Sequence, residues 1–308
     1  MRMLLLAMPD VASSFDRVMR MPNLGLTSLA ANVDGAEVRI LDLVLRPRGV
    51  ADAVRKAVAE FRPDLVGLSA MTFQYDTAKQ VATIVRVALP RARIVLGGYH
   101  ATLAYEDIAA DPAAQVFDYL VRGEGEVALN MLVQAEKQGE GWERIPGLSY
   151  RVGDGFVHNP RGPLVDLGHV RPPAREARMS NGFTYFGRRF DVVETSRGCT
   201  RACRFCSIRH MYGGEYRAYP VERVVADIRA AADAGAQGIF FVDDNINLVP
   251  DRLQQLCEAI VDAGLDKLEF ITQADVTGFA RAPKLAAVMQ RAGFRGVFLG
   301  IESVNGVH

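Results

Sequence analysis

The chain has 308 residues, of which 49% are hydrophobic and 23% are charged. This length is sufficient for two domains that each bury a sizeable hydrophobic core. The 36 basic residues equal the 36 acidic residues in number, so the formal net charge is zero. Such a balance provides no electrostatic footprint for nucleic acid or for an anionic membrane. It favours an enzyme or binding protein that acts on a small molecule.

No targeting or membrane segment is expected. The N-terminal apolar run "MLLLAM" is too short for the core of a signal peptide and ends at Pro9-Asp10. No stretch approaches the length that spans a bilayer. We therefore expect a cytoplasmic protein with no nucleic-acid or membrane partner. In that reducing compartment, clustered cysteines more often bind metal or do chemistry than form disulfides.

Residues 1–140 alternate apolar runs with amphipathic stretches. Strands are expected at residues 2–8, 37–43, 64–70, 92–98 and 117–123. Helices are expected near residues 25–33, 50–61, 76–89, 101–110 and 125–138. This alternation predicts an α/β domain with a doubly wound parallel sheet of the Rossmann-like kind, in which ligands bind beyond the carboxyl ends of the strands.

Residues 141–188 change character and are interpreted as a hairpin followed by a linker. "GLSYRVGDGFVHNP" has the pattern of a hairpin that turns at Gly153-Asp154-Gly155, because Gly and Asp tolerate the backbone angles of a tight turn. The stretch after it is rich in Pro, Gly and Arg and has no periodicity, which is typical of a linker.

Residues 189–308 return to the alternating pattern. Strands are expected at residues 191–196, 238–244, 268–274 and 296–302, and helices at residues 219–234, 250–263 and 281–292. Repeated units of this length predict a parallel β/α barrel with its active site at the carboxyl ends of the strands. Four strands are too few to close a barrel, so an incomplete one is expected. Cys257 lies on the apolar stripe of the second helix and is expected to be a buried core residue.

The other three cysteines, Cys199, Cys203 and Cys206, follow the first of these strands directly. A disulfide would leave one thiol over. A structural zinc site would need a fourth ligand, which His210 could supply. A four-iron cluster can use three cysteines and leave one iron open to a non-protein ligand. Because all the ligands sit in one loop at the catalytic end of a strand, an open coordination position is favoured over a closed zinc site.

Arginines surround this cysteine loop. Their positive charge favours thiolates and compensates a thiolate-rich cluster, although some of them are expected simply to face solvent. The arginines concerned are Arg197, Arg201, Arg204 and Arg209.

The pattern Cys-x-x-x-Cys-x-aromatic-Cys, with Phe205 before the last cysteine, resembles the signature of the radical S-adenosylmethionine (SAM) superfamily. The resemblance implies that Cys199, Cys203 and Cys206 hold a [4Fe-4S] cluster whose fourth iron is chelated by SAM. It also implies reductive cleavage of SAM to a 5'-deoxyadenosyl radical, a place for Phe205 beside the adenine, and an electron donor such as flavodoxin or ferredoxin.

Other barrel positions agree with this resemblance in part. "FFVDDN" stands where the superfamily often has a Gly-Gly-Glu segment that receives the amino group of SAM, so Asp243, Asp244 and Asn245 are candidates for that role. The glycines are absent, and an aspartate here could instead cap the next helix or turn. "FLGIES" is similar to a form common among members with an N-terminal cobalamin domain, which directs Glu302 toward the ribose. Gln273 and Asp275 are candidates for the same pocket.

The first domain resembles the cobalamin-binding domain that precedes many radical SAM barrels. The resemblance rests on "MPNLGLTSLAA", which contains Gly25, and on "VLGGYHA" and "VRGEGE". A Gly-Gly pair at a strand end lets the backbone approach a large flat ligand closely. The lower-ligand motif Asp-x-His-x-x-Gly is absent, which implies cobalamin bound with its base off, or a domain that binds no corrinoid. The expected cobalamin-site residues are Gly25, Gly97, Gly98, His100, Gly123 and Gly125.

Together these features predict a cobalamin-dependent radical SAM enzyme that methylates an unactivated carbon of a small-molecule substrate. Three alternatives stay open at this point. The same scaffold could catalyse a radical oxidative cyclisation or rearrangement. The chain could be a non-catalytic fragment that binds an iron–sulfur cluster and a corrinoid. The cysteine loop with His210 could form a zinc-stapled module.

Overall fold

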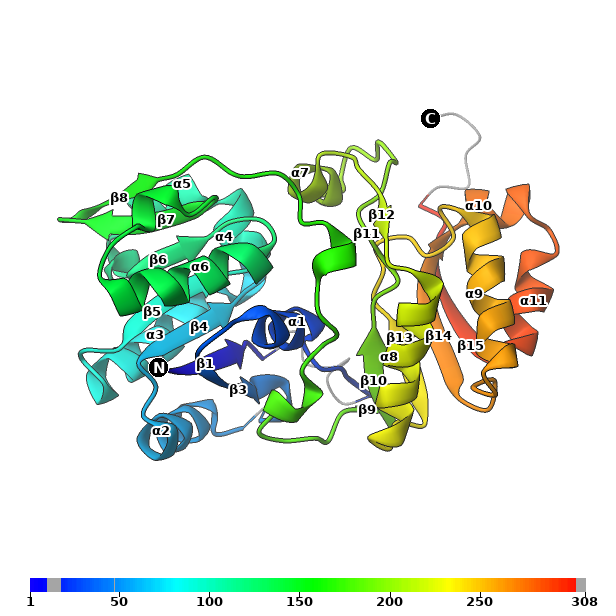
Figure 1. The fold of residues 1–308 in the computed structure, drawn as a ribbon, viewed down its shortest axis with the longest axis horizontal. Coiled ribbons are helices and arrows are strands. Elements are labelled where there is room, and N and C mark those ends of the chain that lie inside the picture. The colour runs from blue at the N-terminus through cyan, green and yellow to red at the C-terminus, as the bar shows by residue number, and fades with distance from the viewer. Residues whose placement is uncertain (10–17, 47, 303–308) are drawn as a thin grey trace. The chain divides into compact units, whose positions relative to one another are not determined.

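The computed structural model describes residues 1–9, 18–46 and 48–302. The chain divides into two compact units, Met1–Gly182 and Phe183–His308 (Figure 1). Each unit contains a parallel sheet. None of the helices in the described ranges is long and apolar enough to cross a membrane.

The first unit alternates strands and helices along the chain. Its strands are β1 (Arg2–Ala7), β2 (Met19–Arg20), β3 (Glu37–Asp42), β4 (Leu65–Ser69), β5 (Arg93–Gly97), β6 (Tyr119–Val121), β7 (Leu148–Val152) and β8 (Gly155–His158). Its α-helices are α1 (Leu24–Asn32), α2 (Val50–Phe61), α3 (Tyr75–Ala88), α4 (Tyr99–Leu103), α5 (Tyr105–Ala110) and α6 (Gly125–Gln138). Its 3-10 helices are η2 (Leu43–Leu45), η3 (Thr72–Gln74), η4 (Pro112–Val116), η5 (Trp142–Arg144), η6 (Leu167–His169) and η7 (Arg175–Ala177).

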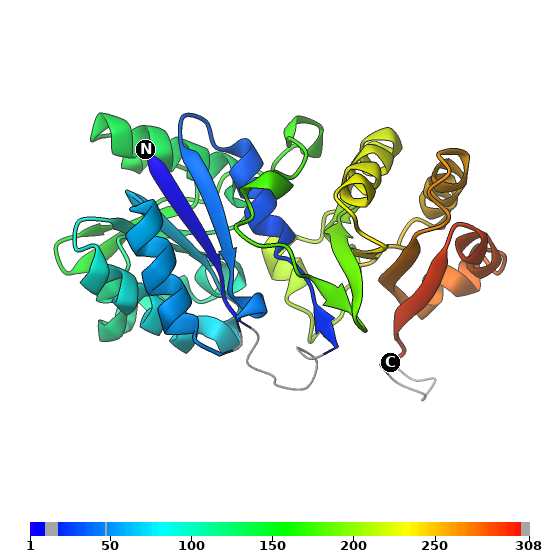
Figure 2. The ribbon, with the colours of Figure 1, turned by 90° about the horizontal axis from the view of Figure 1, so that it is seen from below.

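The prediction of a doubly wound parallel sheet is confirmed. Within the described residues, the sheet has the order β3-β1-β4-β5-β6-β7-β8, and β3, β1, β4, β5 and β6 run parallel. Successive side chains of β1 point to opposite faces: Leu4 and Leu6 pack with α2 and α3, whereas Met3 and Leu5 pack with α1 and α6. Helices therefore cover both faces, which is why the central residues of β1, β4 and β5 are apolar (Figure 2).

The predicted hairpin is present, and it joins the first sheet. β7 pairs antiparallel with β6 and with β8, and Val152 lies opposite Gly155 across a turn of Gly153 and Asp154. The helix expected at residues 101–110 is broken at Ala104, where the backbone leaves the helical region with φ −124°. Alanine is the strongest helix former, so local propensity could not predict this break.

The second unit is an open sheet with helices between its parallel strands. Its strands are β9 (Thr184–Tyr185), β10 (Arg188–Val193), β11 (Ser196–Arg197), β12 (Arg217–Ala218), β13 (Gly238–Phe241), β14 (Glu269–Asp275) and β15 (Phe294–Gly300). Its helices are α7 (Ile208–Tyr212), α8 (Val221–Asp233), α9 (Pro250–Asp262), α10 (Val276–Arg281) and α11 (Leu285–Arg291). β10, β13, β14 and β15 pair in parallel in that order, and the incomplete barrel is confirmed.

An apolar core fixes this sheet against α8, α9 and α11. The rings of Phe241, Phe270 and Phe294 lie 5.4–5.6 Å apart between centroids, one on each of three neighbouring strands. Cys257 of α9 is buried, as expected, and burial raises the pKa of its thiol to about 12. In place of the one helix expected at residues 281–292, the structure has α10, which ends at Arg281, and α11, which begins at Leu285. Pro283 lies between them and disfavours the helical conformation of the residue before it.

Candidate functional site

The cysteine loop follows β11, a short strand that pairs antiparallel with β12. Gly198 begins the loop with φ +84°, and a Cβ at this position would lie 2.1 Å from the backbone oxygen of Glu215. Only glycine can therefore bring the chain out of β11 along this path. Cys206 N donates a hydrogen bond to Cys203 O at 3.2 Å, which folds the end of the loop into a turn before α7.

The three thiols of this loop are free and line one cavity of about 640 Å³. Cys203 is exposed, whereas Cys199 and Cys206 are half-buried. The structure brings most of the predicted barrel-site residues to the same cavity, from the loop itself and from the ends of β13, β14 and β15. Those residues are Phe205, Asp244, Asn245, Gln273, Asp275 and Glu302.

Asp243 differs from its neighbours because its carboxylate turns away from this cavity into the protein. It is fully buried and accepts hydrogen bonds from Thr195 N at 3.0 Å, from Thr195 Oγ1 at 2.7 Å and from Ser196 Oγ. Burial raises the pKa of this carboxyl, against the effect of those hydrogen bonds. The bonds join the end of β10 to the end of β13, so the geometry gives Asp243 a positioning role.

Asp244 and Asn245 lie at the base of the cysteine loop. Asp244 accepts a hydrogen bond from Gly198 N at 2.8 Å, and its pKa is raised to about 6, chiefly by burial. Asn245 Nδ2 lies 3.9 Å from Cys199 Sγ and donates to Asp275 Oδ2 at 2.9 Å. Asn245 Oδ1 is buried and has no hydrogen-bond partner in the described part of the chain. A buried acceptor of this kind is costly unless a donor reaches it, so it marks a place for a ligand N–H.

The remaining candidates lie at the ends of β14 and β15. Gln273 Nε2 donates to Asp243 O at 3.0 Å, and Asp275 caps α10 by accepting from Gly278 N at 2.6 Å. Glu302 has φ +57°, a left-handed conformation that is uncommon for residues other than glycine. Phe205 is 73% exposed, so its ring is available to a planar ligand.

Two of the arginines near the thiols are committed to carboxylates. Arg197 Nε donates to Glu194 Oε2 at 2.9 Å, and Arg201 Nε donates to Asp275 Oδ2 at 2.8 Å. Arg204 and Arg209 are exposed, and Arg209 also lines the cavity.

Three cysteine thiolates are the donor set that a four-iron cluster with one open iron uses. In the ranges that the structure describes, no three His, Cys, Asp or Glu side chains are gathered closely enough to hold one ion. A zinc ion needs four ligands on one atom, whereas the three cysteines of a four-iron cluster bind separate irons. His210 is exposed on α7 and lies outside the lining of the cavity, as far as that lining is described.

In the first unit, the predicted glycines gather at the carboxyl edge of the sheet. Thr102 joins two of the segments: its Oγ1 donates to Gly98 O at 2.8 Å and accepts from Gly123 N at 3.0 Å. Gly98 has φ +90°, and a Cβ there would lie 2.9 Å from Ala70 O. A Cβ at Gly125 would lie 2.9 Å from Leu29. Gly98 is therefore needed for the chain's own packing, whereas the Leu29 side chain beside Gly125 could shift.

The other two glycines are less restricted. A Cβ at Gly97 would lie 3.8 Å from the nearest atom, Val121 O, which is an ordinary contact and leaves space at the strand end. A Cβ at Gly25, in α1, would lie 3.3 Å from Asn23 Oδ1. Asn23 N in turn donates to Asp42 Oδ2 at 3.0 Å, which ties the start of α1 to the carboxyl end of β3.

His100 lies against the protein's own side chains. Its ring centroid is 4.3 Å from that of Tyr75, and its Nδ1 is 3.4 Å from Thr72 Oγ1. Burial lowers its pKa. The segment after β1, where the lower-ligand motif would stand, lies mostly outside the described residues.

Exposed apolar side chains at the same edge were missed by the sequence analysis. Met71 and Phe73 follow β4, Leu103 follows β5, and Val127 follows β6, and they are between 40% and 59% exposed. They follow the carboxyl ends of parallel strands, which is the edge where ligands of such sheets bind. No signal in the sequence marked them, because other apolar residues that directly follow a strand, such as Met8 and Leu43, are buried in the core.

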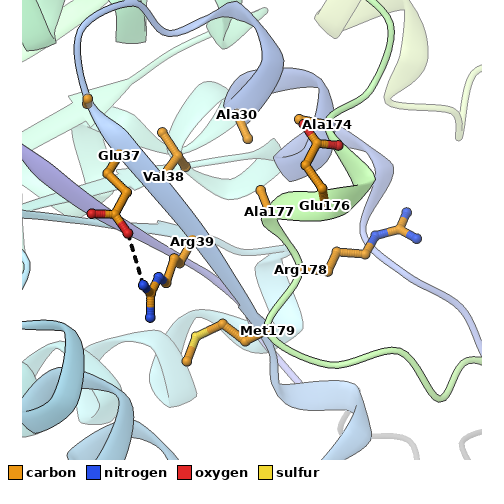
Figure 3. Close-up of a pocket in the computed structure, with 10 residues that line it drawn as sticks. Ala30, Glu37, Val38, Arg39, Ala174, Glu176, Ala177, Arg178 and Met179 are labelled. Carbon is orange, nitrogen blue, oxygen red and sulfur yellow. Dashed lines mark hydrogen bonds and ion pairs between the residues drawn. The ribbon is translucent and has the colours of Figure 1, made fainter.

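A further hollow lies at the opposite end of β3. It is lined by Glu37, Val38 and Arg39 from the start of this strand and by Glu176 and Met179, and Figure 3 shows the ion pair of 2.9 Å between Glu37 and Arg39. Its volume is about 550 Å³. Because it lies at the amino end of the strand, it is separate from the edge where ligands of such sheets bind.

The fold and the site together define an α/β protein of two units. The first unit is a doubly wound sheet, and the second is a partial barrel with a thiol-lined cavity at the carboxyl ends of its strands. Residues 16–133 match the family model of the B12 binding domain, and residues 193–307 match that of the radical SAM superfamily. The chain therefore belongs to the radical SAM superfamily and carries a B12-binding domain ahead of its radical SAM domain.

Relatives of this chain are known by name. It is 31% identical to a protein named as an uncharacterized methyltransferase from Pyrococcus horikoshii, over 98% of this chain and 66% of that protein. It is 27% identical to an anaerobic magnesium-protoporphyrin IX monomethyl ester cyclase from Cereibacter sphaeroides, over 82% and 42%, and 28% identical to a hopanoid C-3 methylase from Methylococcus capsulatus, over 93% and 54%. The chain thus spans between 42% and 66% of the length of these relatives.

Solved structures share the fold. The radical SAM methyltransferase TsrM from Kitasatospora setae superposes with a TM-score of 0.78 at 22% identity, over 99% of this chain and 60% of TsrM. The cobalamin-dependent enzyme OxsB gives a TM-score of 0.78 at 19% identity, over 98% of this chain and 44% of OxsB. At these identities the likeness establishes the architecture of both units.

Proposed function

We propose that this protein is a cobalamin-dependent radical SAM enzyme that methylates an unactivated carbon of a small molecule. The observation that carries the proposal is the cavity in which three free thiols lie beside polar side chains from the ends of β13, β14 and β15. Membership of a superfamily group with a B12-binding domain supports the cobalamin part. A relative named for methyl transfer, the hopanoid C-3 methylase, supports the reaction class.

Cys199, Cys203 and Cys206 would hold three irons of a [4Fe-4S] cluster in this cavity. When bound, the cluster supplies the electron that cleaves SAM to a 5'-deoxyadenosyl radical, and the corrinoid supplies the methyl group. None of the three is in a disulfide, so each can bind iron as its thiolate.

SAM would lie along the same cavity. The buried Oδ1 of Asn245 would accept a hydrogen bond from the amino group of SAM. The carboxylate of Asp244 would compensate the positive charge of SAM. Phe205 would stack on the adenine, while Glu302 and Gln273 would receive the ribose hydroxyls. Asp243 takes no part in binding, since its carboxylate is occupied by Thr195 and Ser196.

Cobalamin would lie on the carboxyl edge of the first sheet with its base off. Met71, Phe73 and Leu103 provide an apolar surface for the corrin ring, and Gly97 leaves space for it. We assign His100 to packing beneath this edge, because its ring rests on Tyr75.

SAM cleavage needs one electron from outside the protein, and a carrier such as flavodoxin or ferredoxin is proposed as the donor. Such carriers and a free-thiol cluster site both require a reducing setting, so we place the protein in the cytoplasm. The free state of all four cysteines supports this.

Anaerobic reconstitution with iron, sulfide and hydroxocobalamin tests the proposal. We expect four irons per chain, lost in Cys203→Ala, and one retained corrinoid. With SAM and a chemical reductant, we expect 5'-deoxyadenosine, and S-adenosylhomocysteine only when the corrinoid is bound. A protein that takes up zinc in place of iron would contradict the proposal.

The relative named as an anaerobic cyclase favours oxidative cyclisation as a second candidate. A cyclase needs no methyl group from SAM, so it would form 5'-deoxyadenosine without S-adenosylhomocysteine. Iron and corrinoid retained with no cleavage of SAM would identify these residues as a non-catalytic binding fragment.

A further inference from the structure

The cysteine loop is tied to the end of β14 by one side-chain contact. Arg201 stands between the first two cysteines, and its Nε donates to Asp275 Oδ2 at 2.8 Å, while its Nη2 lies 2.8 Å from the same oxygen. Both side chains are largely shielded, with 29% and 24% of their surfaces exposed. An ion pair that is shielded from water is screened less than one on the open surface, so this contact constrains the loop.

Asp275 is a rigid anchor for this contact. Its Oδ1 accepts from Gly278 N at 2.6 Å, and its Oδ2 also accepts from Asn245 Nδ2 at 2.9 Å. Its backbone N–H donates to Asn247 Oδ1 at 3.0 Å, and its backbone oxygen accepts from Asn247 Nδ2 at 2.9 Å. The carboxylate is thus held by Asn245, which follows β13, and by Gly278 of α10, independently of the hydrogen bond and ion pair that Arg201 makes to it.

The loop itself contributes little regular structure. Between Gly198 and α7 its backbone makes one turn, from Cys206 N to Cys203 O. A segment of this kind has many conformations available, and a fixed side-chain contact removes most of them. Asn245 extends the contact to the sulfur, because its Nδ2 lies 2.9 Å from Asp275 Oδ2 and 3.9 Å from Cys199 Sγ.

We propose that the Arg201–Asp275 pair, supported by Asn245, holds the cysteine loop in the conformation that receives and retains the cluster. Arg201 and Asp275 are then positioning residues, which act on iron only through the loop. This inference rests on the proposed function. It adds an ion pair outside the cysteine motif to the features that determine how well the cluster is retained. It also removes Asp275 from the residues that would contact SAM.

The experiment compares iron release from anaerobically reconstituted proteins of full length into a ferrous chelator. The variants are Arg201→Gln, Asp275→Asn, the double variant, and Arg201→Lys. Arg204→Gln is the matched control, because Arg204 belongs to the same loop and is exposed. We expect Arg201→Gln and Asp275→Asn each to release iron about fivefold faster than wild type, as the loss of a shielded ion pair implies. The double variant should be no faster than either single one.

Three further readouts separate positioning from a general loss of structure. Arg201→Lys keeps the charge and should restore part of the retention. Far-UV circular dichroism and urea unfolding of the metal-free Arg201→Gln protein should match wild type. The electron paramagnetic resonance spectrum of the reduced cluster should change on Arg201→Gln and stay unchanged on Arg204→Gln. Asp275 also caps α10, so Arg201→Gln remains the decisive variant if Asp275→Asn fails to fold.

Two results would overturn the inference. One is iron release from Arg201→Gln at the rate of Arg204→Gln. The other is a double variant whose rate is the product of the two single effects, which would mean that the side chains act independently. If wild type itself takes up no iron, the proposed function fails instead, and that outcome is visible before any variant is made.

Discussion

Gly198 begins the cysteine loop with a left-handed backbone and with Glu215 O directly beside its α-carbon. We predict that Gly198→Ala lowers the free energy of unfolding by more than about 2 kcal/mol, because the new Cβ meets the backbone and the conformation is strained. Urea unfolding of wild type and variant measures this.

Gly187→Ala is the matched control for that prediction. Gly187 also has a left-handed φ, +79°, but nothing lies within 4 Å of the position of its Cβ. Only the conformational strain applies there, which amounts to about 1 kcal/mol. Equal urea midpoints for the two variants would contradict the role assigned to Glu215 O.

The buried ring of His100 should make the free energy of unfolding depend on pH. Burial lowers its pKa in the folded protein, so the unfolded chain binds a proton at higher pH than the folded chain does. The neutral ring contributes its full share to the free energy of unfolding at pH values above the pKa of His100 in the unfolded chain, about 6.5. This contribution is lost as the pH falls below that value. We expect the stability advantage of wild type over His100→Gln to shrink between about pH 7.5 and about pH 5.5. An advantage that grows in acid, measured by urea unfolding, would show that the ring is stabilised in its charged form.

At the scale of elements, Asp243 joins two strands that are distant in sequence. Three donors, one N–H and two O–H groups from Thr195 and Ser196, converge on its carboxylate, and Arg252 Nη2 donates to Thr195 O at 2.9 Å from the far side. We predict that Asp243→Asn costs about 3 kcal/mol of stability, because its amide would direct N–H groups at other donors.

The control for this prediction is Asp233→Asn, an exposed carboxylate at the end of α8. A change at such a position is expected to stay within about 0.5 kcal/mol. If Asp243→Asn is equally mild in urea unfolding, the hydrogen bonds do not hold β10 to β13.

Boundaries of elements were predicted where a residue imposes them locally. Most strands of the two parallel sheets contain apolar runs, and all of those expected in the parallel sheets are present. Pro283 could have indicated the gap between α10 and α11, since its effect on the preceding residue is local. The break at Ala104 has no local signal, because it depends on how α4 and α5 pack on the sheet.

At the scale of the whole molecule, β15 leaves apolar side chains uncovered. Val297, Phe298 and Leu299 are between 39% and 44% exposed on a strand at the edge of its sheet. A long apolar edge strand offers unpaired backbone groups to another chain. A net charge of zero adds little repulsion between chains.

We therefore predict that these 308 residues self-associate, and that Val297→Lys reduces the association. Light scattering after size exclusion at several protein concentrations measures the mass. Val87→Lys is the control, because Val87 is 77% exposed on α3 and away from any sheet edge. An equal effect of the two lysines would assign the change to charge alone.

The candidate site was predictable to the extent that its residues carry chemistry by type. The cysteine spacing indicated the cluster loop, and "FFVDDN" and "FLGIES" located the strand ends that line the cavity. The sequence did not decide which way each side chain points. Asp243 and Asp244 are adjacent and chemically alike, yet Asp243 is buried in the protein and Asp244 lines the cavity. The partner that selects each orientation, Thr195 or Gly198, is distant in sequence.

The sequence by itself determined the class of both units, because apolar periodicity sets strand and helix, and three closely spaced thiols limit the chemistry to metal. Only the tertiary structure decided which polar side chains serve the site and which serve the fold. Arg201 is one of four arginines near the thiols, and nothing in its neighbourhood along the chain distinguishes it from Arg204. It differs because folding brings Asp275 within 2.8 Å of it, and a contact between residues 74 positions apart follows from strand order and not from local pattern.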